Sequence, residues 1–214
     1  MFGFFATFFI VMIFIVGYAL ERNSATRKYE ETSRRFWERE SLANRTRKKS
    51  LEGLTLITIP LDQLPFSDSE DNTIKECEDI IRTLSSKDII NLTGISNTDL
   101  KLTYGAPNFP YLSNCDQNFT DLARALNQWS KRLLELEQPE DALKVLEFAI
   151  HCKSDISTTY QMLSSIYVKK QQGEKILALM ETAETLNTLL KDKILKNLEE
   201  AYILAGSDFN NILS

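Results

Sequence analysis

The hydrophobic pattern begins with one uninterrupted apolar run, MFGFFATFFIVMIFIVGYAL, which carries no charged side chain from Met1 to Leu20. A helix of about twenty apolar residues matches the thickness of the hydrocarbon core of a bilayer. A cleaved signal peptide would have a basic start, a shorter apolar core and a small-x-small cleavage site. Here no Lys or Arg precedes the apolar run, the run is long, and Gly17-Tyr18-Ala19-Leu20 is a poor cleavage site. We therefore expect residues 1–20 to form a transmembrane anchor that contacts the lipid bilayer through residues 2–20.

Residues 21–50 alternate acidic and basic side chains and contain no Gly or Pro. Good helix formers with interleaved charges predict a helical stalk stabilised by ion pairs within the helix. This stretch contains ten Lys/Arg and only five Asp/Glu. An alternative prediction is therefore that the first cations contact anionic lipid headgroups at the membrane surface; these are Arg22, Arg27 and Lys28. Basic flanks stay in the cytoplasm, so we expect a single-pass inner or plasma membrane protein with its N-terminus outside and its C-terminal domain cytoplasmic.

Two segments separate this basic juxtamembrane stalk from the rest of the chain. Residues 51–70 are rich in β-branched side chains and include Pro60 and Pro65, which oppose a helix. We expect them to form an extended linker that packs on the domain. In residues 71–120 a helical period of apolar residues returns, which predicts a small helical cap region.

Within this cap region the sequence predicts several short elements. Apolar spacing predicts an amphipathic helix at about 72–84. A serine cap and a closing glycine predict a short helix in residues 85–94. A further helix should end at Gly105, and the prolines that follow predict an irregular loop as far as about Asn118.

The C-terminal part, residues 121–206, contains a spacing that recurs. Apolar residues coincide when the chain is shifted by thirty-four residues, which predicts two successive helical hairpins. Pro139 opens a helix where its missing N–H has no consequence. A last helix should end at Gly206 and leave residues 207–214 as a tail. The coinciding pairs are Trp129 with Leu163, Leu133 with Tyr167, Ala142 with Ile176, Leu146 with Met180, and Ala149 with Ala183.

At these positions the chain resembles the tetratricopeptide repeat family. The resemblance implies two units, about 123–156 and 157–190, each made of two antiparallel helices. Ser130 and Ser164 stand where the family has Gly or Ala. The whole chain is also similar to single-pass repeat proteins of clostridial-type bacteria, which implies no activity. The residues in the family's packing positions include Trp129, Leu133, Ala142, Leu146, Ala149, Leu163, Tyr167 and Ala183.

The resemblance also implies a binding groove, which the first helix of each hairpin lines in this family. Such a face, with cations and neutral donors, suits an acidic peptide or a C-terminal carboxylate. It implies a protein or peptide partner without identifying it. The residues carried over by position are Arg124, Asn127, Lys131 and Leu134 from the first unit, and Thr158, Gln161, Ser165 and Lys169 from the second.

Residues 91–102, NLTGISNTDLKL, are similar to the hairpin of helix-hairpin-helix DNA-binding modules at Leu92, Gly94 and Ile95. In that family the turn directs backbone N–H groups at a phosphate. Here a serine replaces the second glycine, and Asp99 would repel phosphate. Beyond residue 50 the chain has fifteen Lys/Arg against twenty-five Asp/Glu, so we expect a tight turn and no nucleic-acid partner.

Candidate chemistry is sparse. The three cysteines are widely spaced without a CxxC pair, which fits neither a disulfide framework nor a zinc site and suits a reducing compartment. The one histidine, His151, adjoins Cys152, but neighbouring residues on a helix point in different directions. No phosphate loop, HExxH or GxSxG motif occurs. We expect no enzyme activity, no metal site and no cofactor.

Together these patterns predict an all-α chain with a transmembrane helix, a helical stalk, an extended linker and a domain of helical-hairpin repeats. The function that we expect is a membrane-anchored cytoplasmic scaffold or adaptor for protein–protein interaction. The alternative is a structural subunit of a membrane, cell-envelope or secretion complex that uses its transmembrane helix for assembly.

Overall fold

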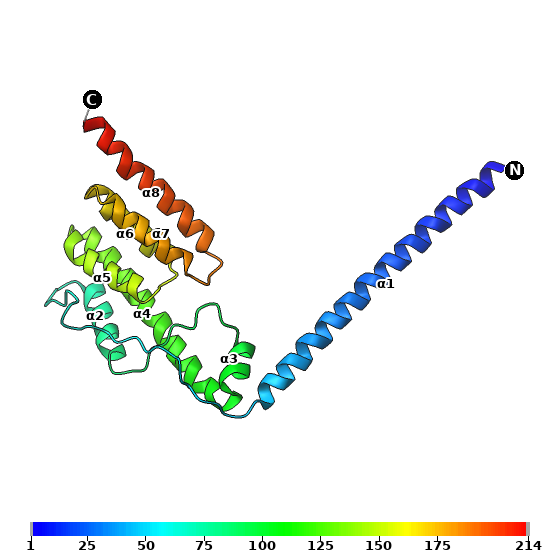
Figure 1. Cartoon of the computed structure of the whole chain (residues 1–214), viewed down its shortest axis with the longest axis horizontal. Helices are drawn as coiled ribbons and strands as arrows, with labels where there is room; N and C mark the ends of the chain where they lie inside the picture. The colour runs from blue at the N-terminus through cyan, green and yellow to red at the C-terminus, as the bar shows by residue number, and fades with distance from the viewer. Residues whose placement is uncertain (1, 213–214) are drawn as a thin grey trace. The chain divides into compact units, whose positions relative to one another are not determined.

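The computed structural model describes residues 2–212, apart from the side chains of residues 207–212 and of most residues between 2 and 25. Over these residues the regular structure is entirely helical and contains no strand, which confirms the all-α class (Figure 1). The chain divides into two compact units. Unit 1 comprises Met1–Ser50 and Ser96–Phe109, and unit 2 comprises Leu51–Ile95 and Pro110–Ser214.

Unit 1 is built around the long helix α1 (Phe2–Arg45), with α3 (Asn97–Tyr104) and the 3-10 helix η1 (Ala106–Asn108). The stalk is thus continuous with the apolar run as far as Arg45, whereas residues 46–50, which were also expected in the helical stalk, are not helical. Among the helices that the structure describes, none combines the length and the apolar character needed to cross a membrane. The anchor expected at 1–20 rests mostly on side chains outside the described residues.

Helix α3 docks on the C-terminal end of α1. Ala43 of α1 and Leu100 of α3 are buried together in this small unit. Beside them the Glu40 carboxylate accepts a hydrogen bond from Lys101 Nζ at 2.8 Å and another from the Thr98 hydroxyl. The contact therefore combines apolar burial with a charge-assisted hydrogen bond.

A glycine allows the chain to leave α3 close to the end of the stalk. Gly105 has φ +91°, and a Cβ atom there would lie 2.2 Å from the carbonyl oxygen of Arg47. The next residue, Ala106, donates its N–H to the carbonyl oxygen of Thr46 at 3.0 Å. Glycine is required here both for the left-handed backbone and for the close approach.

Unit 2 contains the repeat region. Its linker at 51–71 has no helix, and Ile59 and Leu64 bury it against the core. From the same segment, the Phe66 ring packs on the Trp129 indole with 5.2 Å between ring centroids. The helices are α2 (Asn72–Leu84), α4 (Phe109–Glu135, of which Phe109 belongs to unit 1), α5 (Pro139–His151), α6 (Ser157–Lys169), α7 (Gly173–Glu184) and α8 (Lys191–Ile212).

The thirty-four-residue spacing is present in the backbone of the two hairpins. The turns between α4 and α5 and between α6 and α7 have left-handed residues at Glu137 (φ 57°) and Gln171 (φ 55°). The following residues, Gln138 and Gln172, adopt nearly the same dihedrals, (−109°, 63°) and (−101°, 61°). Each donates its N–H at 2.9 Å to a carbonyl oxygen five residues earlier, so the two hairpins close in the same way.

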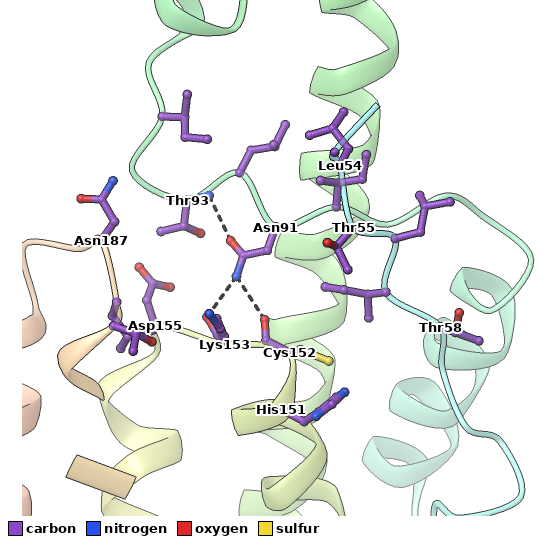
Figure 2. Close-up of a pocket in the computed structure, with 18 residues that line it drawn as sticks. Leu54, Thr55, Thr58, Asn91, Thr93, His151, Cys152, Lys153, Asp155 and Asn187 are labelled. Atoms are coloured by element: carbon purple, nitrogen blue, oxygen red, sulfur yellow. Dashed lines mark hydrogen bonds between the residues drawn. The ribbon is translucent and has the colours of Figure 1, made fainter. Parts of the chain in front are cut away.

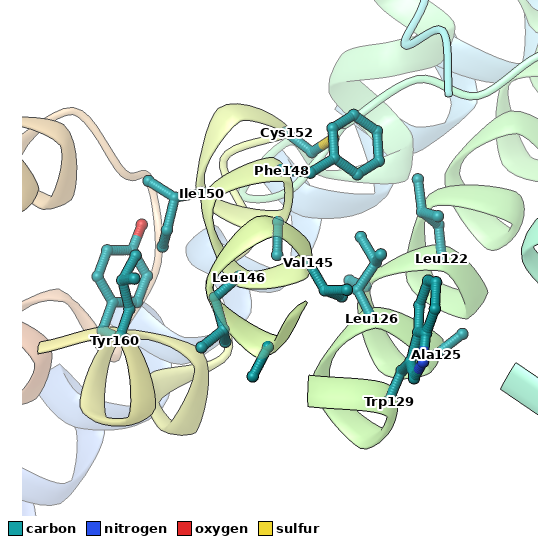
Figure 3. Close-up of a cluster of buried hydrophobic side chains, with 14 of the residues drawn as sticks. Leu122, Ala125, Leu126, Trp129, Val145, Leu146, Phe148, Ile150, Cys152 and Tyr160 are labelled. Atoms are coloured by element: carbon teal, nitrogen blue, oxygen red, sulfur yellow. The ribbon is translucent and has the colours of Figure 1, made fainter. Parts of the chain in front are cut away.

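The core of unit 2 is formed by facing helices (Figure 3). Leu126 of α4 lies beside Val145 of α5, and both are fully buried. Ser130 is also buried, and its hydroxyl donates to the carbonyl oxygen of Leu126 at 2.8 Å, which satisfies it within the helix. The eight residues in the packing positions are all buried: Trp129, Leu133, Ala142, Leu146, Ala149, Leu163, Tyr167 and Ala183.

Two short elements differ from the expectation. Residues 85–94 are not a helix, because backbone N–H groups of this segment bond to α4 and not to one another. Ile90 donates its N–H to the carbonyl oxygen of Cys115, and Leu92 donates its N–H to the Asp116 carboxylate at 3.2 Å. The prediction of a loop as far as Asn118 is also wrong, since α4 begins at Phe109. Pro110 lies in the first turn of α4, where a backbone N–H would have no partner within the helix.

The segment boundaries also differ from those read from the pattern. Helix α4 crosses the boundary expected between residues 120 and 121, because its buried apolar positions continue without a break from Leu112 to Leu133. Residues 96–109, expected in the cap region, belong to unit 1. At the C-terminal end α8 continues to Ile212, past the glycine that predicted its end.

Candidate functional site

The face carried over from the repeat resemblance begins at the contact between α4 and α6. Asn127 of α4 donates from Nδ2 to the hydroxyls of Thr158 (2.9 Å) and Thr159 (2.8 Å) on α6. Its amide therefore holds the two first helices together and is engaged within the fold. Leu134 is partly buried and packs against the core, so it is also engaged within the fold.

The remaining side chains of this face are exposed. Arg124 and Lys131 lie one turn before and one turn after Asn127, so they share its side of α4. Lys131 reaches Glu135 at 4.0 Å, which weakens its availability only slightly because both side chains are solvated. The structure thus leaves a polar, mainly cationic face of five exposed residues: Arg124, Lys131, Gln161, Ser165 and Lys169.

A second candidate site is a pocket of about 740 Å³ in unit 2, which the pattern of the sequence did not indicate (Figure 2). Its walls come from four segments that are distant along the chain. They are the extended segment 53–58, the segment 90–95, the turn between α5 and α6 at 151–155, and the loop between α7 and α8 at 185–187.

The extended segment is held beside the pocket at few points. Ile57 donates its N–H to the carbonyl oxygen of Ile89 at 2.9 Å. Further along, Ile59 is buried in the core and fixes the end of the segment. Two apolar side chains of the lining are exposed to solvent, since Leu56 is 51% exposed and Ile95 is 43% exposed. The pocket therefore has an open, partly apolar mouth.

Asn91 organises the floor of the pocket. Its Nδ2 donates to the carbonyl oxygens of Cys152 (3.1 Å) and Lys153 (3.0 Å), and its Oδ1 accepts the N–H of Thr93 at 3.0 Å (Figure 2). Lys153 has φ 56°, so a non-glycine residue holds a left-handed conformation at this turn. One amide thus joins two segments and supports the turn between α5 and α6.

A close backbone approach shapes the third wall. Gly94 has φ +82°, and a Cβ atom there would lie 2.3 Å from the carbonyl oxygen of Asn187. The Asn187 amide donates back to the carbonyl oxygen of Gly94 at 3.1 Å. Gly94, one of the residues that match the hairpin of DNA-binding modules, is therefore required for packing against the loop before α8.

The pocket lining carries little net charge and no activated nucleophile. Its charged side chains are Lys153 and Asp155, one of each sign, beside the exposed imidazole of His151. Burial raises the pKa of the Cys152 thiol to about 12, so the thiol is protonated at neutral pH. Over the described residues, no group of three or more His, Cys, Asp or Glu side chains could hold a metal ion.

A smaller hollow of about 460 Å³ adjoins the same extended segment. It shares Thr58 and His151 with the larger pocket and continues along Pro60 to Phe148 and Lys144. The extended segment thus borders these two hollows at residues 53–58 and at Pro60, Gln63 and Leu64.

The residues expected at the membrane surface lie on α1. Arg22, Arg27 and Lys28 are exposed to solvent.

Compared with known proteins, the chain matches no family model, no curated protein and no solved structure at a significant level.

Proposed function

We propose that this chain is a membrane-anchored adaptor whose helical-repeat unit holds a protein partner at the membrane surface. The apolar run 2–20 anchors the chain, and unit 2 lies on the cytoplasmic side. The family resemblance gives the same expectation for the repeats. The proposal includes no catalytic step, no cofactor and no nucleic acid.

One observation carries the proposal. The two hairpins close with nearly the same dihedrals and with equivalent hydrogen bonds thirty-four residues apart, so successive first helices stand in equivalent positions. Equivalent exposed residues of α4 and α6 then form one continuous face. Three cations distributed over that face, Arg124, Lys131 and Lys169, suit an acidic peptide.

The test is crosslinking in membranes followed by capture of the full chain. The native chain is compared with Arg124→Glu/Lys131→Glu/Lys169→Glu. A charge-matched control replaces three exposed lysines elsewhere on the chain: Lys48→Glu/Lys75→Glu/Lys87→Glu.

A partner retained by the control and lost by the first variant supports the repeat face. If both variants retain the partner, the contact is not on this face. If the native chain captures no protein, the adaptor proposal fails.

A second candidate is a structural subunit of a membrane complex, in which the anchor itself pairs with another membrane helix. The observation that favours it is the continuity of α1, which joins the apolar run rigidly to the stalk as far as Arg45. Replacing residues 2–20 with an unrelated apolar helix separates the two candidates. An adaptor keeps its partner after this exchange, whereas a subunit that assembles through its anchor loses it.

A further inference from the structure

The extended segment 54–58 leaves backbone groups without partners at the edge of the 740 Å³ pocket. Over the described part of the chain, its backbone hydrogen bonds are those donated by Leu54 to Leu51 and by Ile57 to Ile89. The N–H and C=O groups of Thr55, Leu56 and Thr58 have no partner among the described residues. Unpaired groups along an extended segment are a template on which another chain can form a strand.

The spacing of these groups fits backbone pairing. Leu56 and Thr58 are two residues apart, and every second residue of a strand offers its N–H and C=O to the same edge. The five residues of the segment span about 16 Å in an extended conformation, which matches a peptide of about five residues. An extended peptide added to such an edge gains affinity from main-chain hydrogen bonds and specificity from pockets for alternate side chains.

The lining of the pocket determines which side chains would fit. Leu56 and Ile95 present exposed apolar surface in the lining, and Leu186 adds a buried apolar side chain. The charged side chains of the lining, Lys153 and Asp155, balance one another. A balanced lining gives no net attraction for an acidic or phosphorylated ligand, and an apolar mouth excludes a strongly charged one.

We propose that this pocket binds an extended, uncharged peptide segment with apolar side chains, paired through its backbone to residues 54–58. This inference rests on the proposed adaptor function and names the chemistry of a partner segment. The site is separate from the cationic face of α4 and α6, so one partner can be recognised at two places or two partners can be held together.

The experiment uses the full chain in detergent micelles and a displayed library of random seven-residue peptides. Selected peptides are synthesised with capped ends, and their affinity is measured by fluorescence polarisation. Leu56→Glu places a charge in the mouth of the pocket. Ile80→Glu is the matched control, because Ile80 is 43% exposed on α2 and does not line the pocket.

We expect apolar, β-branched peptides whose affinity falls by about tenfold or more in Leu56→Glu and stays within about twofold in Ile80→Glu. N-methylation of alternate peptide amides should abolish binding, since it removes the donors of the ladder. Leu56→Pro, which removes one N–H that the fold does not use, should weaken binding while the far-UV circular dichroism stays native.

Other outcomes overturn the inference. If selected peptides bind Leu56→Glu as tightly as the native chain, their binding site is not this pocket. If N-methylated peptides keep their affinity, they do not pair through their backbone. A selection without enriched peptides also contradicts the pocket. The adaptor proposal fails separately, when membrane crosslinking captures no partner, so each result is assigned to one of the two proposals.

Discussion

The side chains of Asp71 and Arg132 join the start of α2 to α4, sixty-one residues apart in the chain. Asp71 Oδ2 accepts hydrogen bonds from Arg132 Nη2 at 2.7 Å and from Nε at 2.9 Å. Asp71 Oδ1 meanwhile accepts the N–H groups of Thr73 and Ile74 and caps α2. One carboxylate therefore fixes both a helix terminus and its packing on the first repeat helix.

We predict that Asp71→Ala lowers the melting temperature at neutral pH by about 2–4 °C, because α2 loses its cap and Arg132 loses its partner. Asp71→Asn should have a smaller effect, since an amide oxygen can still accept one backbone N–H. Thermal unfolding followed by circular dichroism measures both. Equal melting temperatures for the native chain and Asp71→Ala would show that the cap contributes nothing.

The same pair predicts a dependence on pH. Hydrogen bonds from Arg132 and from the backbone N–H of Ile74 lower the pKa of Asp71 in the folded state. The group therefore stabilises the fold above the carboxyl pKa of the unfolded chain, about 3.9, and this contribution is lost as the pH falls through the lowered native value. Urea unfolding measured at a series of pH values from 6 downwards should show that the free energy of unfolding falls more steeply with decreasing pH in the native chain than in Asp71→Asn. Parallel curves would contradict the assignment.

The sequence and the structure agree where a local pattern carries the information. The thirty-four-residue spacing is readable because each hairpin buries residues at fixed positions, such as Leu133 and Tyr167, and the turns repeat with them. The pocket is not readable, because its four segments meet only in the folded chain. The floor of the pocket could not be predicted from Asn91 either. Asn91 precedes a tight turn, but its amide donates hydrogen bonds to carbonyl groups sixty-one and sixty-two residues away, and the local sequence does not indicate these partners.

The buried thiols should be unreactive in the native chain. Cys77, Cys115 and Cys152 are between 0% and 5% exposed, and burial raises the pKa of Cys77 to about 11 and that of Cys152 to about 12. A thiol alkylates as its thiolate, so both accessibility and protonation oppose the reaction. We expect no labelling by iodoacetamide at pH 8 in the native chain and three labels in urea, counted by mass spectrometry. Rapid native labelling of any of them would show local opening.

The glycine at the end of α3 should determine whether unit 1 holds together. Gly105→Ala places a methyl group against the carbonyl oxygen of Arg47 and strains a backbone with φ +91°. Hydrogen exchange of the amides of Ala106 and Lys49, which bond across the unit, should accelerate by about tenfold or more. Gly206→Ala is the control, because a Cβ atom added there in α8 would meet no atom within 4 Å outside the neighbouring backbone of its own helix. Unchanged exchange in Gly105→Ala would show that the close approach is absent in solution.

The support of the pocket floor by Asn91 predicts a measurable loss of stability. Asn91→Ala leaves the carbonyl oxygens of Cys152 and Lys153 without their donor and should lower the free energy of unfolding by about 1 kcal/mol. Gln117→Ala removes an exposed amide that bonds Asp121 one turn away and should change it by less than about 0.5 kcal/mol. Urea unfolding compares the two variants. Equal stabilities would mean that the amide does not support the turn.

The repeat packing leads to a final prediction about the hairpin core. Leu146 of α5 is fully buried, whereas Leu177 of α7 is 41% exposed, although both are leucines on the second helix of a hairpin. Leu146→Ala should lower the free energy of unfolding by about 2–5 kcal/mol, because it removes apolar contacts and leaves a cavity between helices. Leu177→Ala should lower it by less than about 1 kcal/mol, since solvent already covers much of that side chain. Urea unfolding followed by circular dichroism measures both. Equal losses would contradict the helix orientation on which the cationic face depends, because a rotation of the second helices would change which side of each hairpin remains free for a partner.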